Sequence, residues 1–176
     1  MTNKNKALLV IDMQKGLFED SKPVHNEEQL LLNIYSLIEK ARQNDIPVFF
    51  IQHSNKTTLV KGSETWQLHP EIRPLDNEQI IHKSYRDAFF KTELKVEFER
   101  LQVGELFVTG LVSEGCVMAT VTGALERGYK VQLVSDGHSS NSTNPHLKVK
   151  KWNQILSERG AVLVRTQDVG FGREEG

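Results

Sequence analysis

Apolar runs of strand length alternate with segments of helical period along nearly the whole of this sequence. The apolar runs lie at residues 6–12, 46–52, 79–83, 105–110, 129–135 and 161–164. Between most of them, apolar residues recur three and four positions apart, which predicts amphipathic helices. These helices are expected at residues 27–43, from Thr92 to Gly104, at 114–127 and from Asn144 to Gly160. The alternation predicts an α/β protein, in which a six-stranded, mostly parallel, Rossmann-like sheet lies between two layers of helices.

Length and composition narrow the classes of protein to which this chain can belong. Its 176 residues fit one domain over 1–176. The 22 basic and 23 acidic residues give a net charge of −1. The sequence contains no basic cluster, so we expect no nucleic-acid partner. The longest apolar run, Ala7–Ile11, is too short for a membrane span or a signal peptide, so we expect a cytoplasmic protein without a membrane partner. The one cysteine, Cys116, excludes an intrachain disulfide and a multi-cysteine zinc site.

Four polar or reactive residues stand where predicted strands end. Asp12 ends the first strand, His53 follows the second, Lys83 ends the third, and Cys116 comes shortly after the fourth. Ligands of parallel α/β sheets bind beyond the carboxyl ends of the strands. We therefore expect these four residues at one edge of the sheet, around a binding site.

Cys116 has two interpretations. With Ser113 as the N-cap, the cysteine falls in the first turn of a helix, where free amides and the helix dipole lower a thiol pKa. Alternatively, it is a core cysteine beside Val117, since free cysteines are usually buried. Its place at the binding edge favours the reactive thiol.

Asp12 and Lys83 strengthen that interpretation when they are taken together with the cysteine. Alone, Asp12 could cap the next turn, and Lys83 could be a solvated surface residue. Together with Cys116 they supply a base, a cation and a nucleophile, which is the set that thiol catalysis of acyl transfer requires.

Three segments of the chain resemble the isochorismatase-like cysteine hydrolases, a family that includes nicotinamidases and N-carbamoyl amidohydrolases. The segments are ALLVIDMQKGLF around Asp12, HKSYRDAFFKTEL around Lys83 and VTGLVSEGCVMATVTGALERGYKV around Cys116. The last is similar to the family pattern Thr-Gly-x-x-Thr-x-x-Cys-Val, with Ser113 in place of the second threonine. The resemblance implies that Asp12, Lys83 and Cys116 are a catalytic triad.

The resemblance also implies the surroundings of the triad. A cis peptide is expected at Leu111–Val112, and the backbone amides of Val112 and Cys116 would form an oxyanion hole. The family usually forms homodimers or larger homo-oligomers, sometimes with a neighbour closing the pocket. The expected pocket residues are Phe18, His53, Trp66 and Phe89. For the three aromatic residues, core packing is an equally good alternative.

No metal or other cofactor is expected. Nicotinamidases bind a metal through an Asp-x-His pair after the second strand and a further histidine. Here the stretch from Gln52 to Asn55 reads QHSN, and only His69 matches a ligand. The sequence contains no glycine-rich phosphate-binding loop, so we expect no bound nucleotide. The simplest interpretation of His138 and His146 is that both lie on a polar surface near a loop.

The residues therefore predict a cysteine hydrolase that cleaves an amide-type C–N bond of a small molecule through a thioester. Two alternatives stay open: hydrolysis of an isochorismate-like vinyl ether, and a non-catalytic binding module on the same fold. The substrate depends on the loops at 13–26 and 54–77, whose conformations the sequence does not specify.

Overall fold

The computed structural model describes residues 5–172, so the ends of the expected domain, 1–4 and 173–176, lie outside the described residues. The strands are β1 (Asn5–Ile11), β2 (Val48–His53), β3 (Gln79–Lys83), β4 (Val103–Leu111), β5 (Lys130–Ser139) and β6 (Val162–Val164). The helices are α1 (Lys15–Phe18), α2 (Glu27–Gln43), α3 (Leu94–Arg100), α4 (Met118–Glu126) and α5 (Pro145–Glu158), with the short turns η1 (Ser113–Val117) and η2 (Thr166–Asp168). Of these, α1 and η2 have no counterpart in the prediction.

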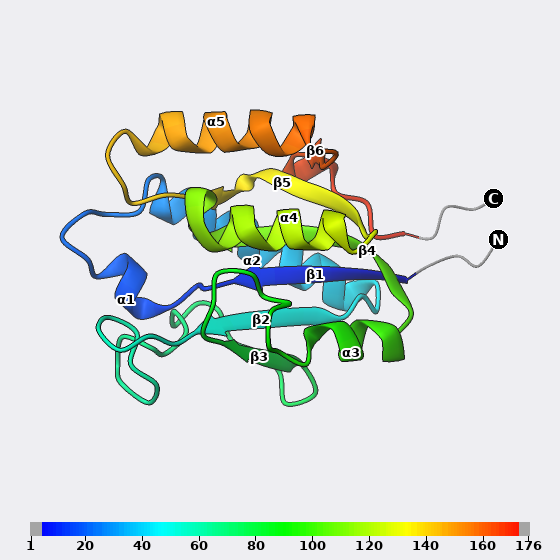
Figure 1. The fold of residues 1–176 in the computed structure, drawn as a ribbon, viewed down its shortest axis with the longest axis horizontal. Coiled ribbons are helices and arrows are strands. Elements are labelled where there is room, and N and C mark those ends of the chain that lie inside the picture. Colours follow the sequence, from blue (N-terminus) through cyan, green and yellow to red (C-terminus); the bar gives the residue numbers. More distant parts are fainter. Residues whose placement is uncertain (1–4, 173–176) are drawn as a thin grey trace.

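The six strands form one sheet in the order β3-β2-β1-β4-β5-β6, and every neighbouring pair is parallel. Helices cover both faces of this sheet: α3 and α4 lie in front of it and α2 behind it in Figure 1. The predicted three-layer α/β fold is confirmed, and the sheet is parallel throughout. Among the described residues, no helix is both long and apolar enough to cross a membrane.

Side-chain alternation along each buried strand divides the core between the two faces. In β1, Leu9 and Ile11 belong to the core cluster that includes residues of α3, α4 and α5, whereas Leu8 and Val10 belong to the cluster beneath α2. Successive strand residues point to opposite faces, so a strand covered on both sides must be apolar throughout. This requirement explains the continuous apolar runs in the sequence.

The strand order reverses direction between β1 and β4, which are neighbours in the sheet. In doubly wound sheets such a reversal opens a crevice at the carboxyl ends of the two strands. This reversal point lies between Asp12, directly after β1, and the turn that carries Cys116, after β4. The close approach of the strands requires Gly110, because a Cβ there would lie 2.1 Å from the carbonyl oxygen of Ile11.

An irregularity in the pairing of β4 with β5 changes which residues lie beside the end of β4. Val108 pairs with Leu133, but Gly110 pairs with His138, so β5 bulges outward and then pairs with β4 again. The sequence prediction ended this strand at Ser135, because the polar stretch that follows indicates a loop. The extension brings His138 and Ser139 alongside the end of β4.

Candidate active site

The four strand-end residues come together at the carboxyl edge of the sheet. Asp12 is 2 % exposed and Lys83 also 2 %, although both carry charged side chains. Asp12 adopts a left-handed backbone conformation with φ of 50°, which is uncommon outside glycine. The chain turns sharply at this point, and its carboxylate is held at the end of β1 rather than in solvent.

The ammonium group of Lys83 is the centre of the cluster. Its Nζ lies within hydrogen-bond distance of atoms of four residues, namely Asp12 Oδ2 at 3.1 Å, Tyr85 O at 3.1 Å, Cys116 Sγ at 3.1 Å and His53 Nδ1 at 3.0 Å. The pair with Asp12 compensates both buried charges, which unpaired would each be costly to bury. Lysine thereby joins the carboxylate to the sulfur.

The two carboxylate oxygens of Asp12 have different surroundings. Oδ1 is buried and has no hydrogen-bond partner among the described residues, while Oδ2 accepts from Lys83. A buried oxygen without a partner is uncommon in proteins and is often found at functional sites.

The turn that carries Cys116 differs from the prediction. Residues Ser113–Val117 form a π-type turn, with Gly115 in a non-helical conformation, and the regular helix α4 begins only at Met118. The hydroxyl of Ser113 bonds with His138 Nδ1 at 2.7 Å and with the carbonyl of Ser139 at 3.0 Å, and forms no cap. The prediction that Ser113 caps a helix with Cys116 in its first turn is therefore wrong.

The predicted low pKa of the thiol is also wrong. Burial, together with the negative charge of Asp12, raises the pKa of Cys116 to about 12, and Lys83 opposes that rise only in part. Desolvation disfavours the thiolate more than one ammonium group favours it. At neutral pH the resting site thus holds a neutral thiol beside a carboxylate–ammonium pair.

A buried polar network, which the sequence did not predict, holds the turn at Ser113–Val117 in place. His138 is 3 % exposed, so the expectation of a surface histidine is wrong at this position. Its Nδ1 faces Ser113, and its Nε2 lies 2.7 Å from Oδ1 of Asn153 in α5. Burial lowers the pKa of His138 below its ordinary value, which keeps the ring neutral. The network ties the turn before Cys116 to β5 and α5.

The Leu111–Val112 peptide is cis, at the position that the family resemblance indicates. The carbonyl of Val112 accepts from the amides of Gly115 at 3.0 Å and Val117 at 3.3 Å. The amide of Cys116 takes no part in these two bonds.

The remaining pocket residues lie in different surroundings. Phe18 is partly buried, and its ring centroid lies 4.8 Å from that of His69. Trp66 stacks on His82 and donates from Nε1 to Ser54 Oγ at 3.0 Å. Phe89 is 5 % exposed and stacks on Tyr129 within the core, as the core-packing alternative expects.

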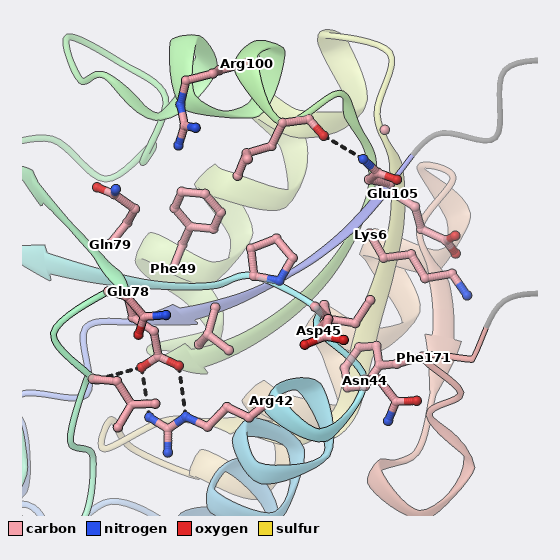
Figure 2. Close-up of a pocket in the computed structure, with 18 of the residues that line it drawn as sticks. Lys6, Arg42, Asn44, Asp45, Phe49, Glu78, Gln79, Arg100, Glu105 and Phe171 are labelled. Atoms are coloured by element: carbon pink, nitrogen blue, oxygen red, sulfur yellow. Dashed lines mark hydrogen bonds and ion pairs between the residues drawn. The ribbon is translucent and has the colours of Figure 1, made fainter.

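One large cavity lies away from the Asp12, Lys83 and Cys116 cluster. Its volume is about 1380 Å³, and its lining includes Lys6, Asp45 and Phe49 near the amino ends of the strands (Figure 2). Two ion pairs lie in its lining, Arg42–Glu78 at 2.8 Å and Lys130–Glu105 at 3.2 Å. Volume alone therefore does not identify the site.

The residues of the cluster fit an ammonium group better than a metal ion. Atoms of Asp12, His53 and Cys116 lie within 4.8 Å of one another, and such groups ligate zinc in other proteins. Here Lys83 Nζ bonds to all three. His69, the other candidate ligand, accepts from the amide of Glu71 through Nδ1.

Known proteins share the fold of this chain and part of its sequence. Residues 6–168 match the isochorismatase domain family. The chain belongs to the isochorismatase-like hydrolase family. This hydrolase is 36 % identical over 135 residues to the isochorismatase family protein YddQ of Bacillus subtilis, covering 74 % of this chain and 75 % of YddQ.

Two further relatives extend the comparison. The hydrolase is 32 % identical over 137 residues to a streptothricin hydrolase of Streptomyces noursei, covering 77 % of this chain but only 50 % of that enzyme. A crystal structure of an isochorismatase family protein superimposes with a TM-score of 0.86 at 27 % identity, over 92 % of this chain and 98 % of that one.

Proposed function

We propose that this hydrolase cleaves an amide-type C–N bond of a small molecule through a thioester on Cys116, with Asp12 and Lys83 completing a catalytic triad. The observation that carries the proposal is the position of the buried Lys83 ammonium, 3.1 Å from both Asp12 Oδ2 and Cys116 Sγ. A nucleophile, a base and a fixed cation in mutual contact are what covalent acyl transfer needs.

The first half of the reaction forms the thioester. The thiol proton moves to Asp12 Oδ1 as the sulfur attacks the substrate carbonyl carbon, because the raised pKa of Cys116 leaves little thiolate in advance. The amides of Val112 and Cys116 are proposed to hold the oxyanion. Asp12 then gives its proton to the leaving nitrogen, the C–N bond breaks, and an amine or ammonia departs.

The second half restores the enzyme. Water gives a proton to Asp12, and its oxygen attacks the thioester carbon. The C–S bond breaks, the carboxylic acid product leaves, and the proton returns to the sulfur. Asp12 thus acts as a base and an acid in turn, which requires it to lie close to both the sulfur and the leaving group.

The test is a panel of small amides, ureido acids and isochorismate, assayed for release of amine, ammonia or the vinyl ether products. We expect C–N cleavage, loss of turnover in Cys116→Ala, and an acyl adduct on the Cys116 peptide after acid quenching. Turnover that survives Cys116→Ala, or cleavage of isochorismate alone, would contradict the proposal.

The family resemblance further suggests a homodimer or larger homo-oligomer, with a small-molecule substrate as the other partner. Light scattering measures the assembly directly, and a monomer at micromolar concentration would contradict this part of the proposal.

A further inference from the structure

The ammonium group of Lys83 has more hydrogen-bond acceptors than protons. An ammonium group carries three N–H donors, whereas Nζ has four partners at 3.0–3.1 Å. Three of them are strong acceptors: the Asp12 carboxylate, the Tyr85 carbonyl and a ring nitrogen of His53. The fourth, the Cys116 sulfur, is a weak acceptor while it carries its proton. The resting enzyme therefore has no N–H left over for the sulfur.

The role of His53 as an acceptor follows from its surroundings. An imidazolium would point an N–H at the ammonium group 3.0 Å away, placing donor against donor and charge against charge. Burial and the charge of Lys83 lower the pKa of His53, whereas the charge of Asp12 and a backbone hydrogen bond with Tyr85 oppose this in part. The ring is thus neutral, with its proton on Nε2 and a free lone pair on Nδ1.

The backbone of His53 is fixed independently of its ring. The amide of His53 donates to Gln14 Oε1 at 2.9 Å, and Gln14 Nε2 donates back to the carbonyl of His53 at 2.9 Å. Gln14 is completely buried, and its Nε2 also donates to the carbonyl of Trp66. This side-chain amide links the chain after β1 to the end of β2, and so holds His53 in register with Asp12.

We infer that His53 is a positioning residue that withholds one Lys83 N–H from Cys116 in the resting enzyme and so keeps the nucleophile in the thiol form. When the thiol loses its proton, the sulfur becomes a charged acceptor, and one N–H turns from the neutral ring to it. This inference deepens the proposed function and rests on its roles for Lys83 and Cys116. The charged groups that face the ring and the thiol are Lys83 and Asp12.

The experiment measures alkylation of Cys116 by iodoacetamide against pH, which needs no substrate. His53→Asn keeps an acceptor near the position of Nδ1, whereas His53→Leu removes it. We expect His53→Leu to alkylate about tenfold faster at pH 8, equal to about 1.4 kcal/mol, with its profile shifted to lower pH. His53→Asn should remain within about threefold of the wild type, because its acceptor still competes for the N–H.

Two controls separate this effect from others. His82→Leu removes the exposed histidine next to Lys83, which stacks on Trp66, and should leave the profile unchanged. In a Lys83→Met background, His53→Leu should no longer accelerate alkylation, which distinguishes competition for the N–H from a general change in solvation. If the Lys83→Met chain does not fold, the comparison of Asn with Leu decides alone.

An unchanged or slower rate in His53→Leu overturns the inference, as does equal acceleration in His53→Asn. Because alkylation reports on the free enzyme, an enzyme inactive on every amide would overturn the proposed function and leave this result standing.

Discussion

Replacing Lys83 by methionine tests whether the buried ion pair holds the site together. The two charged atoms lie 3.1 Å apart, and both side chains are almost fully buried. At an effective dielectric constant near 20, charges at that distance attract by about 5 kcal/mol. Breaking a buried pair from one side costs a similar roughly 3–5 kcal/mol, because the other charge is left without compensation.

The same reasoning predicts that a second substitution restores stability. Asp12→Asn removes the stranded charge, and asparagine tolerates the left-handed backbone at this position. We expect Lys83→Met to lower the melting temperature by roughly 6–20 °C, from about 2–4 °C per kcal/mol for a chain of this size. The double variant should regain at least half of that loss, yet stay as inactive as either single variant.

Urea unfolding at pH 7 of the wild type, both single variants and the double variant gives the coupling free energy from a double-mutant cycle. We expect about 3–5 kcal/mol. If the two single losses simply add in the double variant, the carboxylate and the ammonium group do not stabilise each other, and the account of a neutral, paired resting site is refuted.

Three further results are expected. Asp12→Asn should lower kcat by about 10²–10⁴-fold, the usual contribution of general acid–base catalysis, with a smaller change in KM. A near-normal kcat in steady-state assays would show that Asp12 only caps the turn after β1 and takes no part in catalysis. The pKa of Cys116 is raised to about 12. The rate at which the free enzyme is alkylated should therefore keep rising roughly tenfold per pH unit up to pH 10. A plateau near pH 8.5 would contradict the conclusion that burial raises this pKa. Chelation with EDTA should leave turnover unchanged. The reason is that Lys83 Nζ lies at the centre of the only cluster of three possible metal ligands among the described residues. If activity were lost with EDTA and regained with zinc, His53 and His69 would be metal ligands.

The fold could be predicted because parallel strands that are covered on both faces produce a simple pattern in the sequence. Each must be apolar throughout, and the carboxyl ends of all strands meet at one edge. Those two facts were enough to place Asp12, Lys83 and Cys116 near one another. Neither depends on details of the loops.

The parts that could not be predicted depend on irregular backbone. His138 is buried because β5 bulges and then pairs again with β4, and no local pattern in the polar segment after Ser135 signals that extension. The low pKa expected for Cys116 assumed a regular helix start, but the chain makes a π-type turn with Gly115 in a non-helical conformation. Burial and the charge of Asp12 then raise the pKa of Cys116 more than Lys83 lowers it. The acceptors Tyr85 O and His53 Nδ1 likewise become visible only when the strand ends are in place.

A thiol with a high pKa is consistent with catalysis when the charge of the whole site is followed through the reaction. At rest, the site holds one carboxylate and one ammonium group and is neutral. When the thiol proton moves to Asp12 and the sulfur attacks, the negative charge passes to the substrate oxygen, and the ammonium group stays unchanged. No step adds a charge to a region that water does not solvate well, which is where an added charge costs most. A preformed thiolate would instead put a second negative charge beside Asp12, and that repulsion is one cause of the raised pKa of Cys116. Lys83, which contacts both Asp12 and Cys116, compensates whichever of them is negative. A ligand that cannot accept the negative charge, such as an amine without a carbonyl group, should therefore bind without moving the thiol proton of Cys116 to Asp12.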